Sequence, residues 1–74
     1  MTDAGLAVLR VLAGGPASVT DISRVTKICG RKTRGALRGA CVAGLVTPPD
    51  IVNDDYRWHI TASGRDEVER WSGF

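Results

Sequence analysis

The chain has 74 residues, 43% of them hydrophobic and 24% charged, which is typical of a soluble globular domain and excludes an intrinsically disordered one. Because it is short and begins with Met, we expect one domain over residues 1–74 without a ligand-sensing or catalytic domain. The net charge is only +2, but six of the ten basic residues lie within residues 24–38 and six of the eight acidic residues lie from residue 50 onward. The middle of the chain is therefore basic and its end acidic.

The reactive side chains exclude several classes of protein. Cys29, Cys41 and His59 show no CxxC or HxxxH spacing, so we expect no metal, no cofactor and reduced thiols in a cytoplasmic protein. No apolar stretch reaches the roughly 18 residues of a membrane span, and no signal peptide is recognisable. Because no nucleophile is paired with a base and no phosphate loop is present, we expect neither an enzyme nor a small-molecule ligand.

The first predicted helix spans Asp3–Ala13 and has a wide apolar face. This face carries Leu6, Leu9 and Leu12, with Val8 and Val11 beside them. Thr2 or Asp3 can cap the helix, and Gly14–Pro16 ends it, because glycine tolerates positive φ and proline cannot continue a helix.

A stub strand over Ala17–Val19 and a second helix are predicted next. Ser18 or Thr20 can cap this helix. Its expected buried positions are Ile22, Val25 and, just beyond its end, Ile28.

A third helix is predicted from Arg31 to about Ala43, after a turn over Lys27–Gly30. Its inner face carries small residues and one leucine, namely Thr33, Ala36, Leu37 and Ala40. These small side chains allow close packing against the second helix, and Gly44 can end the third helix in the left-handed conformation.

The last part of the chain predicts a hairpin and a final helix. Strands are expected over Leu45–Thr47 and Tyr56–Thr61, around turn formers at Pro48–Asp50 and Asn53–Asp55. In the second strand Tyr56, Trp58 and Ile60 would point inward, and Arg57 and His59 outward. The final helix is predicted over about Ala62–Trp71, with Thr61 or Ser63 as its cap. We expect Trp71 to pack on the first helix or to contact a second subunit, and the pattern predicts no position for Phe74.

The basic charge gathers on one face of the third helix. At about 100° per residue, Arg31, Arg34 and Arg38 fall within an arc of roughly 60°. Neighbouring arginines form like-charge pairs at i,i+3 and i,i+4, each costing an isolated helix about 0.2–0.5 kcal/mol. Residues 24–38 contain no carboxylate, whereas a solvated face usually mixes signs. The pattern therefore favours an anionic partner, and nucleic acid in particular.

Three stretches resemble the winged helix-turn-helix regulators of the MarR and PadR type. They are Thr20–Val25, Ala36–Arg38 with Gly44–Val46, and Trp58–Arg65, which match the positioning helix, the recognition helix leading into a strand, and the junction after the wing. The resemblance covers about Leu6–Trp71. It implies a mainly α fold with a three-helix core, a two-stranded wing and a C-terminal helix, in a protein that binds duplex DNA.

The resemblance also implies roles for individual side chains. The basic residues of the third helix would face the major groove, where arginine can bind guanine O6 and N7, and Lys32 is better placed for a phosphate. Arg24 and Lys27 would contact phosphates that set the register. The predicted DNA-binding set is Arg24, Lys27, Arg31, Lys32, Arg34, Arg38 and Arg57.

Two features depart from the family pattern. The wing loop carries Asp50, Asp54 and Asp55, whereas wings that enter the minor groove usually present Arg or Lys, so these acids either form a simple turn or repel phosphate. Gly35 and Gly39 share the outward face of the third helix, and each costs about 0.5–1 kcal/mol relative to alanine. These two glycines either let the helix backbone approach DNA closely or have no function and are tolerated by the fold.

Two functions remain open. The first is a stand-alone duplex-DNA-binding protein, either a transcriptional regulator or an architectural or recombination factor of the kind that phages and mobile elements encode, located on the nucleoid. The second is a winged-helix module that docks on another protein through its acidic wing or apolar ends. RNA binding is less favoured because the basic stretch contains no aromatic residue.

We also expect a weak homodimer through the first and last helices, because the core is small. The operator, the sense of regulation and the host are not defined by the sequence.

Overall fold

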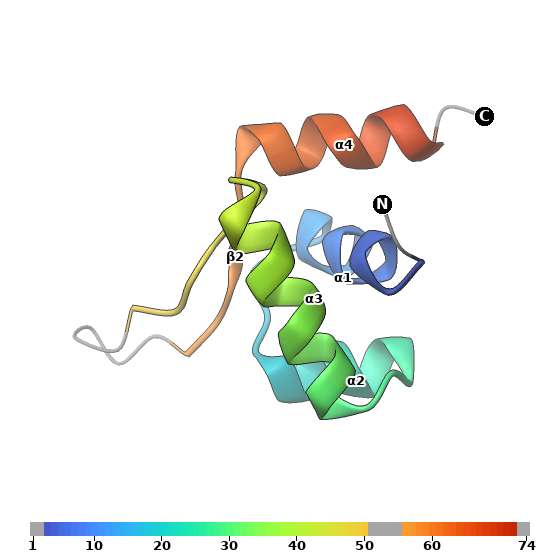
Figure 1. Cartoon of the computed structure of the whole chain (residues 1–74), viewed down its shortest axis with the longest axis vertical. Helices are drawn as coiled ribbons and strands as arrows, with labels where there is room; N and C mark the ends of the chain where they lie inside the picture. Colours follow the sequence, from blue (N-terminus) through green and yellow to red (C-terminus); the bar gives the residue numbers. More distant parts are fainter. Residues whose placement is uncertain (1–2, 51–55, 73–74) are drawn as a thin grey trace.

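The computed structural model describes residues 3–50 and 56–72, which form four helices and a two-stranded antiparallel hairpin. The elements in chain order are α1 (Asp3–Ala13), α2 (Val19–Thr26), α3 (Gly30–Val42), β1 (Val46–Thr47), β2 (His59–Ile60) and α4 (Ala62–Ser72). In Figure 1, α1 lies between α4 and α2, α3 crosses in front of it, and the hairpin leads away from the helices. This is the predicted order of elements. Thr2, Asn53, Asp54, Asp55 and Phe74, which were named above, lie outside the described residues.

The helix α1 is the centre of the core and has the predicted bounds. Val8, Leu9 and Leu12 are fully buried, and Leu6 and Val11 are half-buried. The helix packs against α2, α3 and α4 and also against β2. Its wide apolar face is therefore used within the chain.

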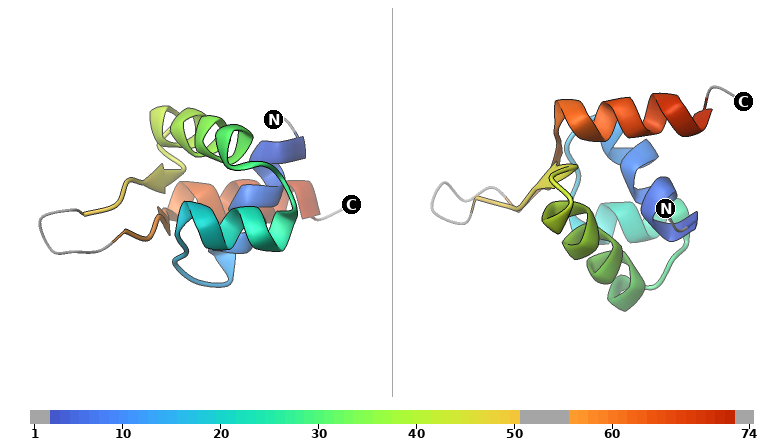
Figure 2. Two further views of the ribbon diagram at one scale, coloured as in Figure 1. Left: turned by 90° about the horizontal axis from the view of Figure 1, so that it is seen from below. Right: turned by 45° about the horizontal axis from the view of Figure 1, so that its top comes forward.

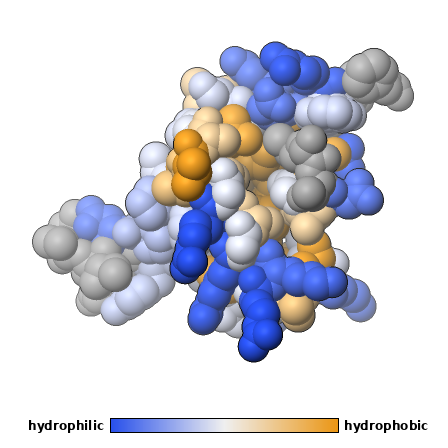
Figure 3. All heavy atoms as spheres, in the orientation of Figure 1, coloured by the Kyte–Doolittle hydropathy of each residue, from blue (hydrophilic) through white to orange (hydrophobic). Residues whose placement is uncertain are grey.

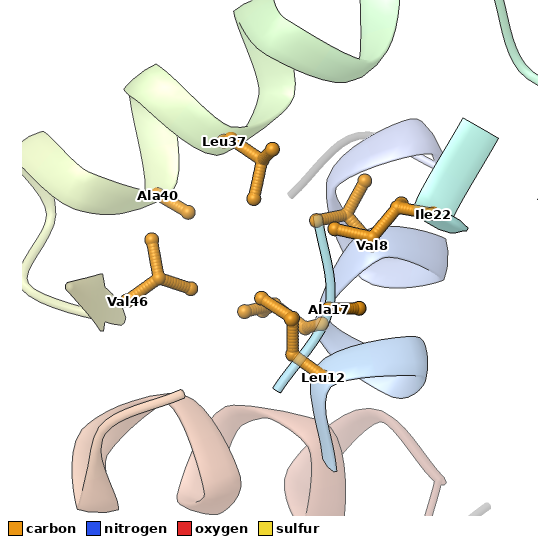
Figure 4. Close-up of a cluster of buried hydrophobic side chains, with 8 residues drawn as sticks. Val8, Leu12, Ala17, Ile22, Leu37, Ala40 and Val46 are labelled. Atoms are coloured by element: carbon orange, nitrogen blue, oxygen red, sulfur yellow. The ribbon is translucent and has the colours of Figure 1, made fainter. Parts of the chain in front are cut away.

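One cluster of buried side chains joins the helices to the first strand. Leu37 and Ala40 of α3 extend toward Val46 of β1, and α1 supplies Val8 and Leu12 across from them (Figure 4). Its members are Val8, Leu9, Leu12, Ala17, Ile22, Leu37, Ala40 and Val46. Burying a side chain of the size of leucine contributes about 1.5–3 kcal/mol, so this cluster stabilises the position of α3 against α1 and β1.

The start of α2 differs from the predicted stub strand. Only Ala17 pairs, in an antiparallel bridge with Trp58 whose two N···O distances are 2.7 and 3.2 Å. Ser18 is the N-cap, because its side-chain oxygen accepts a hydrogen bond from the Asp21 amide at 3.2 Å. Val19 is already helical, so the prediction of Ser18 as a cap is confirmed and the strand at Val19 is wrong.

Val25 was predicted to be buried and is 67% exposed. The buried face of α2 runs through Val19 and Ile22, and Val25 lies about 90° around the helix from their midline. The helix ends one residue later, at Thr26, so no further turn covers Val25. Ile28, in the following turn, is half-buried.

The helix α3 begins at Gly30, one residue before the predicted start, and ends at Val42. Gly44 has a φ of +78°, which confirms the left-handed residue predicted after this helix. The predicted inner face is also confirmed, with Thr33, Leu37 and Ala40 buried and Ala36 half-buried.

The strands are shorter than predicted. Val46 pairs with Ile60 and Thr47 with His59, and the ladder does not extend to Tyr56. Tyr56 lies outside β2 and is 62% exposed, against prediction. His59 pairs with the exposed Thr47, as an outward-facing strand residue does, but it is half-buried rather than exposed.

Thr61 fixes the start of α4 against the end of α3. Its hydroxyl accepts a hydrogen bond from the Gly64 amide at 3.1 Å, as an N-cap does, and donates one to the Gly44 carbonyl at 2.8 Å. Trp71, near the other end of α4, does not pack in the core, because it is 44% exposed and its indole N–H donates to Glu67 Oε2 at 3.2 Å. No helix within residues 3–50 and 56–72 is long and apolar enough to cross a membrane.

Candidate nucleic-acid interface

The helices α2 and α3 form a helix-turn-helix whose three-residue turn is held by hydroxyl groups. Ser23 Oγ and Thr33 Oγ1 both donate to the Ile28 carbonyl, the latter at 3.4 Å. Thr26 Oγ1 accepts a hydrogen bond from the Ile28 amide at 3.3 Å. Thr33 is fully buried, so α3 is tied to the turn from its inner side and its outer side is left to solvent.

Lys27 makes the bend between the two helices. Its backbone is left-handed, with φ 60° and ψ 24°, and its amide donates to the Ser23 carbonyl at 2.8 Å. Non-glycine residues are uncommon in this conformation. The exposed side chain of Lys27 lines a shallow hollow together with Lys32 and the first turns of α1, which contribute the exposed carboxylate of Asp3.

Arg31, Arg34 and Arg38 form one exposed surface on α3, which we call the arginine face. Together with Gly30 and Gly35 they line a second shallow hollow, of about 500 Å³. Within the described residues no carboxylate pairs with any of the three arginines. Figure 3 shows the hydrophilic side chains that project from this part of the molecule. The arginine face therefore presents uncompensated positive charge.

The remaining predicted DNA-binding residues lie apart from these two hollows. Arg24 is exposed in the last turn of α2, and Arg57 is exposed just before the bridge at Trp58. The structure thus groups the three arginines in one place and the two lysines in another, and places Arg24 and Arg57 in neither group.

The cysteines are free thiols in this structure. Cys29 is exposed as the N-cap of α3, and Cys41 is half-buried near the other end of the same helix. Twelve residues of helix separate them by about 18 Å, too far for a disulfide. No group of three potential metal ligands occurs among the described residues.

A groove between α1, α3 and α4, which we call the helical groove, was not predicted from the sequence. Its volume is about 840 Å³, and the three helices border it in the right view of Figure 2. It is lined by Ala4, Gly5, Leu9, Lys32, Gly35, Ala36, Gly39, Ala40, Ala43, Leu45 and Glu67. The spacing of small residues at positions 35, 39 and 43 was a signal for it. Gly35 and Gly39 are both exposed, as predicted; Gly35 lines this groove and the hollow of the arginine face, whereas Gly39 lines only the groove of these two.

No family model and no curated protein matches the sequence. One solved structure is similar to this chain over 99% of its length, with a TM-score of 0.88 and 25% sequence identity. It is the structure of BpsR from Bordetella bronchiseptica, a protein whose DNA binding is regulated by 6-hydroxynicotinic acid. The match covers 54% of the BpsR chain, so this chain spans about half the length of that protein. Together with the four helices and the hairpin, the similarity confirms the predicted fold: the chain is a winged helix-turn-helix domain of the kind found in DNA-binding regulators.

Proposed function

We propose that this chain binds duplex DNA as part of a transcriptional regulator and inserts α3 into the major groove. The observation that carries the proposal is the arginine face, which is exposed on the second helix of a helix-turn-helix and has no carboxylate partner among the described residues. In helix-turn-helix proteins this second helix contacts base edges. The DNA binding of BpsR, at 25% identity over nearly the whole chain, supports the same function.

The two groups of basic residues have different roles in this proposal. The arginine face contacts base edges, because guanidinium groups can bind guanine bidentately. Lys27 and Lys32 lie together in a separate hollow and contact phosphates, which fixes the position of the domain on the duplex. Arg24 on α2 and Arg57 beside the hairpin add phosphate contacts at the two sides.

The response of BpsR to 6-hydroxynicotinic acid is not part of the proposal. That protein is about twice as long, and this chain covers 54% of it. We therefore carry over DNA binding alone.

The proposal is tested by titrating duplex DNA with the parent chain at several salt concentrations. The logarithm of the binding constant should fall linearly with the logarithm of the salt concentration, because bound phosphates release counterions. The variant Arg31→Ala, Arg34→Ala, Arg38→Ala should lose at least about 100-fold in affinity for a preferred site, since each good base contact contributes about 1–3 kcal/mol.

A charge-matched variant with Arg10, Arg65 and Arg70 changed to alanine controls for net charge, because these residues are exposed on α1 and α4. It should keep most of the affinity, and both variants should retain the helical circular-dichroism signal. If the arginine-face variant binds as tightly as the parent, the arginine face does not bind DNA. The alternative, docking on an acidic protein surface, would then be favoured.

A further inference from the structure

The recognition helix contains glycines that the fold does not require. A Cβ atom placed on Gly30, Gly35 or Gly39 would meet nothing within 4 Å, and none of the three has a positive φ. Glycine in a helix interior is destabilising relative to alanine, because it loses more backbone entropy on folding. Nothing inside the described part of the molecule therefore explains the absence of a side chain at these positions.

Gly35 differs from Gly39 in its neighbours. It lines the hollow of the arginine face, where Arg31, Arg34 and Arg38 stand at positions i−4, i−1 and i+3 around it. At this point the helix backbone is bare, with the three guanidinium-bearing side chains on one side of it and the helical groove on the other. A partner that engages the arginines can thus approach the backbone more closely at Gly35 than any other residue would allow.

The axial spacing of the arginines fits consecutive base pairs. At 1.5 Å per residue, Arg31 and Arg34 are about 4.5 Å apart along the helix axis and Arg34 and Arg38 about 6 Å, a total span of about 10.5 Å. Base pairs in B-DNA are about 3.4 Å apart, so the arginine face spans roughly three steps, or four consecutive pairs.

The composition of α3 restricts which bases it can read. Its sequence, GRKTRGALRGACV, contains no Asn or Gln to bind adenine and no Asp or Glu to accept a hydrogen bond from cytosine. Arginine forms its bidentate contact with O6 and N7 of guanine. The polar side chains on the exposed face are thus only arginines and one lysine, and both residue types are matched to guanine.

We propose that α3 recognises a guanine-rich element of about four base pairs in the major groove, with Gly35 at the point of closest approach. This inference rests on the proposed function and adds to it the class of DNA sequence. The arginines supply the base contacts, and Gly35 lets the helix lie deep enough for them to reach the base edges.

Selection of tight-binding duplexes from a random pool tests the sequence class. We expect guanine at two or three positions within four consecutive base pairs. Replacing these guanines one at a time with 7-deazaguanine removes the N7 acceptor and leaves the phosphates unchanged. Each replacement should weaken binding about five- to tenfold, with the salt dependence unchanged.

Gly35→Leu and Gly39→Leu form a matched pair that tests the close approach. Both should fold at least as stably as the parent, because leucine is a better helix former, both positions are exposed, and a Cβ atom at either meets nothing within 4 Å. Gly35→Leu should lose the preference for the selected site and retain salt-sensitive binding to random duplex, whereas Gly39→Leu should keep both.

The outcomes separate the two levels of the proposal. Salt-sensitive binding without guanine preference, or indifference to 7-deazaguanine, would overturn the guanine inference while leaving duplex binding in place. If Gly35→Leu keeps the full site preference, the role of Gly35 is wrong. No binding to any duplex at low salt would overturn the proposed function itself.

Discussion

Gly64 determines how closely α4 can approach the segment that follows α3. A Cβ atom at this position would overlap the Leu45 carbonyl oxygen and the Ile60 side chain. The same carbonyl accepts a hydrogen bond from the Thr61 amide at 2.9 Å, so it is not free to move away. The absence of one side chain thus allows the hairpin and α4 to meet at the base of the wing.

Gly64→Ala should therefore destabilise the fold by about 1–3 kcal/mol, because overpacking forces the backbone apart. Chemical denaturation monitored by circular dichroism measures this change. Ser63→Ala is the control, since Ser63 is exposed on the same helix turn and its substitution should stay within about 0.5 kcal/mol. Equal denaturation midpoints for Gly64→Ala and the parent would show that the contact is not restrictive.

The burial of single side chains was harder to predict from the sequence than the position of the helices. Val25 lies three residues after the buried Ile22, but the buried face of α2 is centred between Val19 and Ile22, which leaves Val25 67% exposed. Strand alternation places the side chain of Tyr56 inward. Alternation predicts burial only within a paired strand, however, and β2 begins at His59. Both errors arise because burial depends on how elements meet, which local pattern does not contain.

At the scale of elements, the turn between α2 and α3 combines two roles at Lys27. Its backbone makes a left-handed bend that glycine would adopt without steric cost, and its side chain is exposed beside Lys32. Replacing Lys27 with glycine therefore keeps the left-handed bend and removes only the charge of the side chain.

Lys27→Gly should leave the free energy of unfolding unchanged or raise it by up to about 1 kcal/mol, because the strain at positive φ is relieved. In the proposed function Lys27 contacts a phosphate, so the slope of log binding constant against log salt should fall in magnitude by about one unit. Arg70→Ala removes one charge from α4 and should leave the slope unchanged. A slope for Lys27→Gly equal to that of the parent would remove Lys27 from the interface.

The helices were predictable because their start and stop signals are local. Gly14–Pro16 ends α1 at the expected residue, and Gly44 ends α3 within one residue of it. The strands were less predictable, since β1 and β2 pair across a loop and Trp58 pairs with Ala17, more than forty residues away in sequence. The arginine face followed from helical spacing alone, whereas the helical groove depends on how α1, α3 and α4 are arranged in space.

At the scale of the whole molecule, the structure changes the basis for the expected homodimer. The wide apolar face of α1 is occupied by α2, α3 and α4, so it no longer indicates a second subunit. Trp71 on α4 is one of the large hydrophobic side chains exposed in the described part of the chain, with Val25, Val42 and Tyr56. Its indole N–H donates to Glu67, which lines the helical groove. The exposed surface of α4 carries both Arg65 and Arg70 and both Asp66 and Glu69, a mixture that can pair with itself across a two-fold axis.

We therefore expect a weak homodimer in which α4 and the start of α1 meet their two-fold copies, with Trp71 at the contact. Sedimentation equilibrium should show a mass that rises with concentration through the high micromolar range. Trp71→Ala should abolish this rise and change the free energy of unfolding of the monomer by less than about 0.5 kcal/mol, because within the chain the indole makes only an exposed i,i+4 contact.

Val25→Ala is the matched control, since Val25 is also exposed but lies on α2, at the other side of α1 from α4 (Figure 1). It should dimerise like the parent. A monomer at all concentrations, with Trp71→Ala changing neither mass nor stability, would rule out this interface, and the domain would then bind DNA as a single copy.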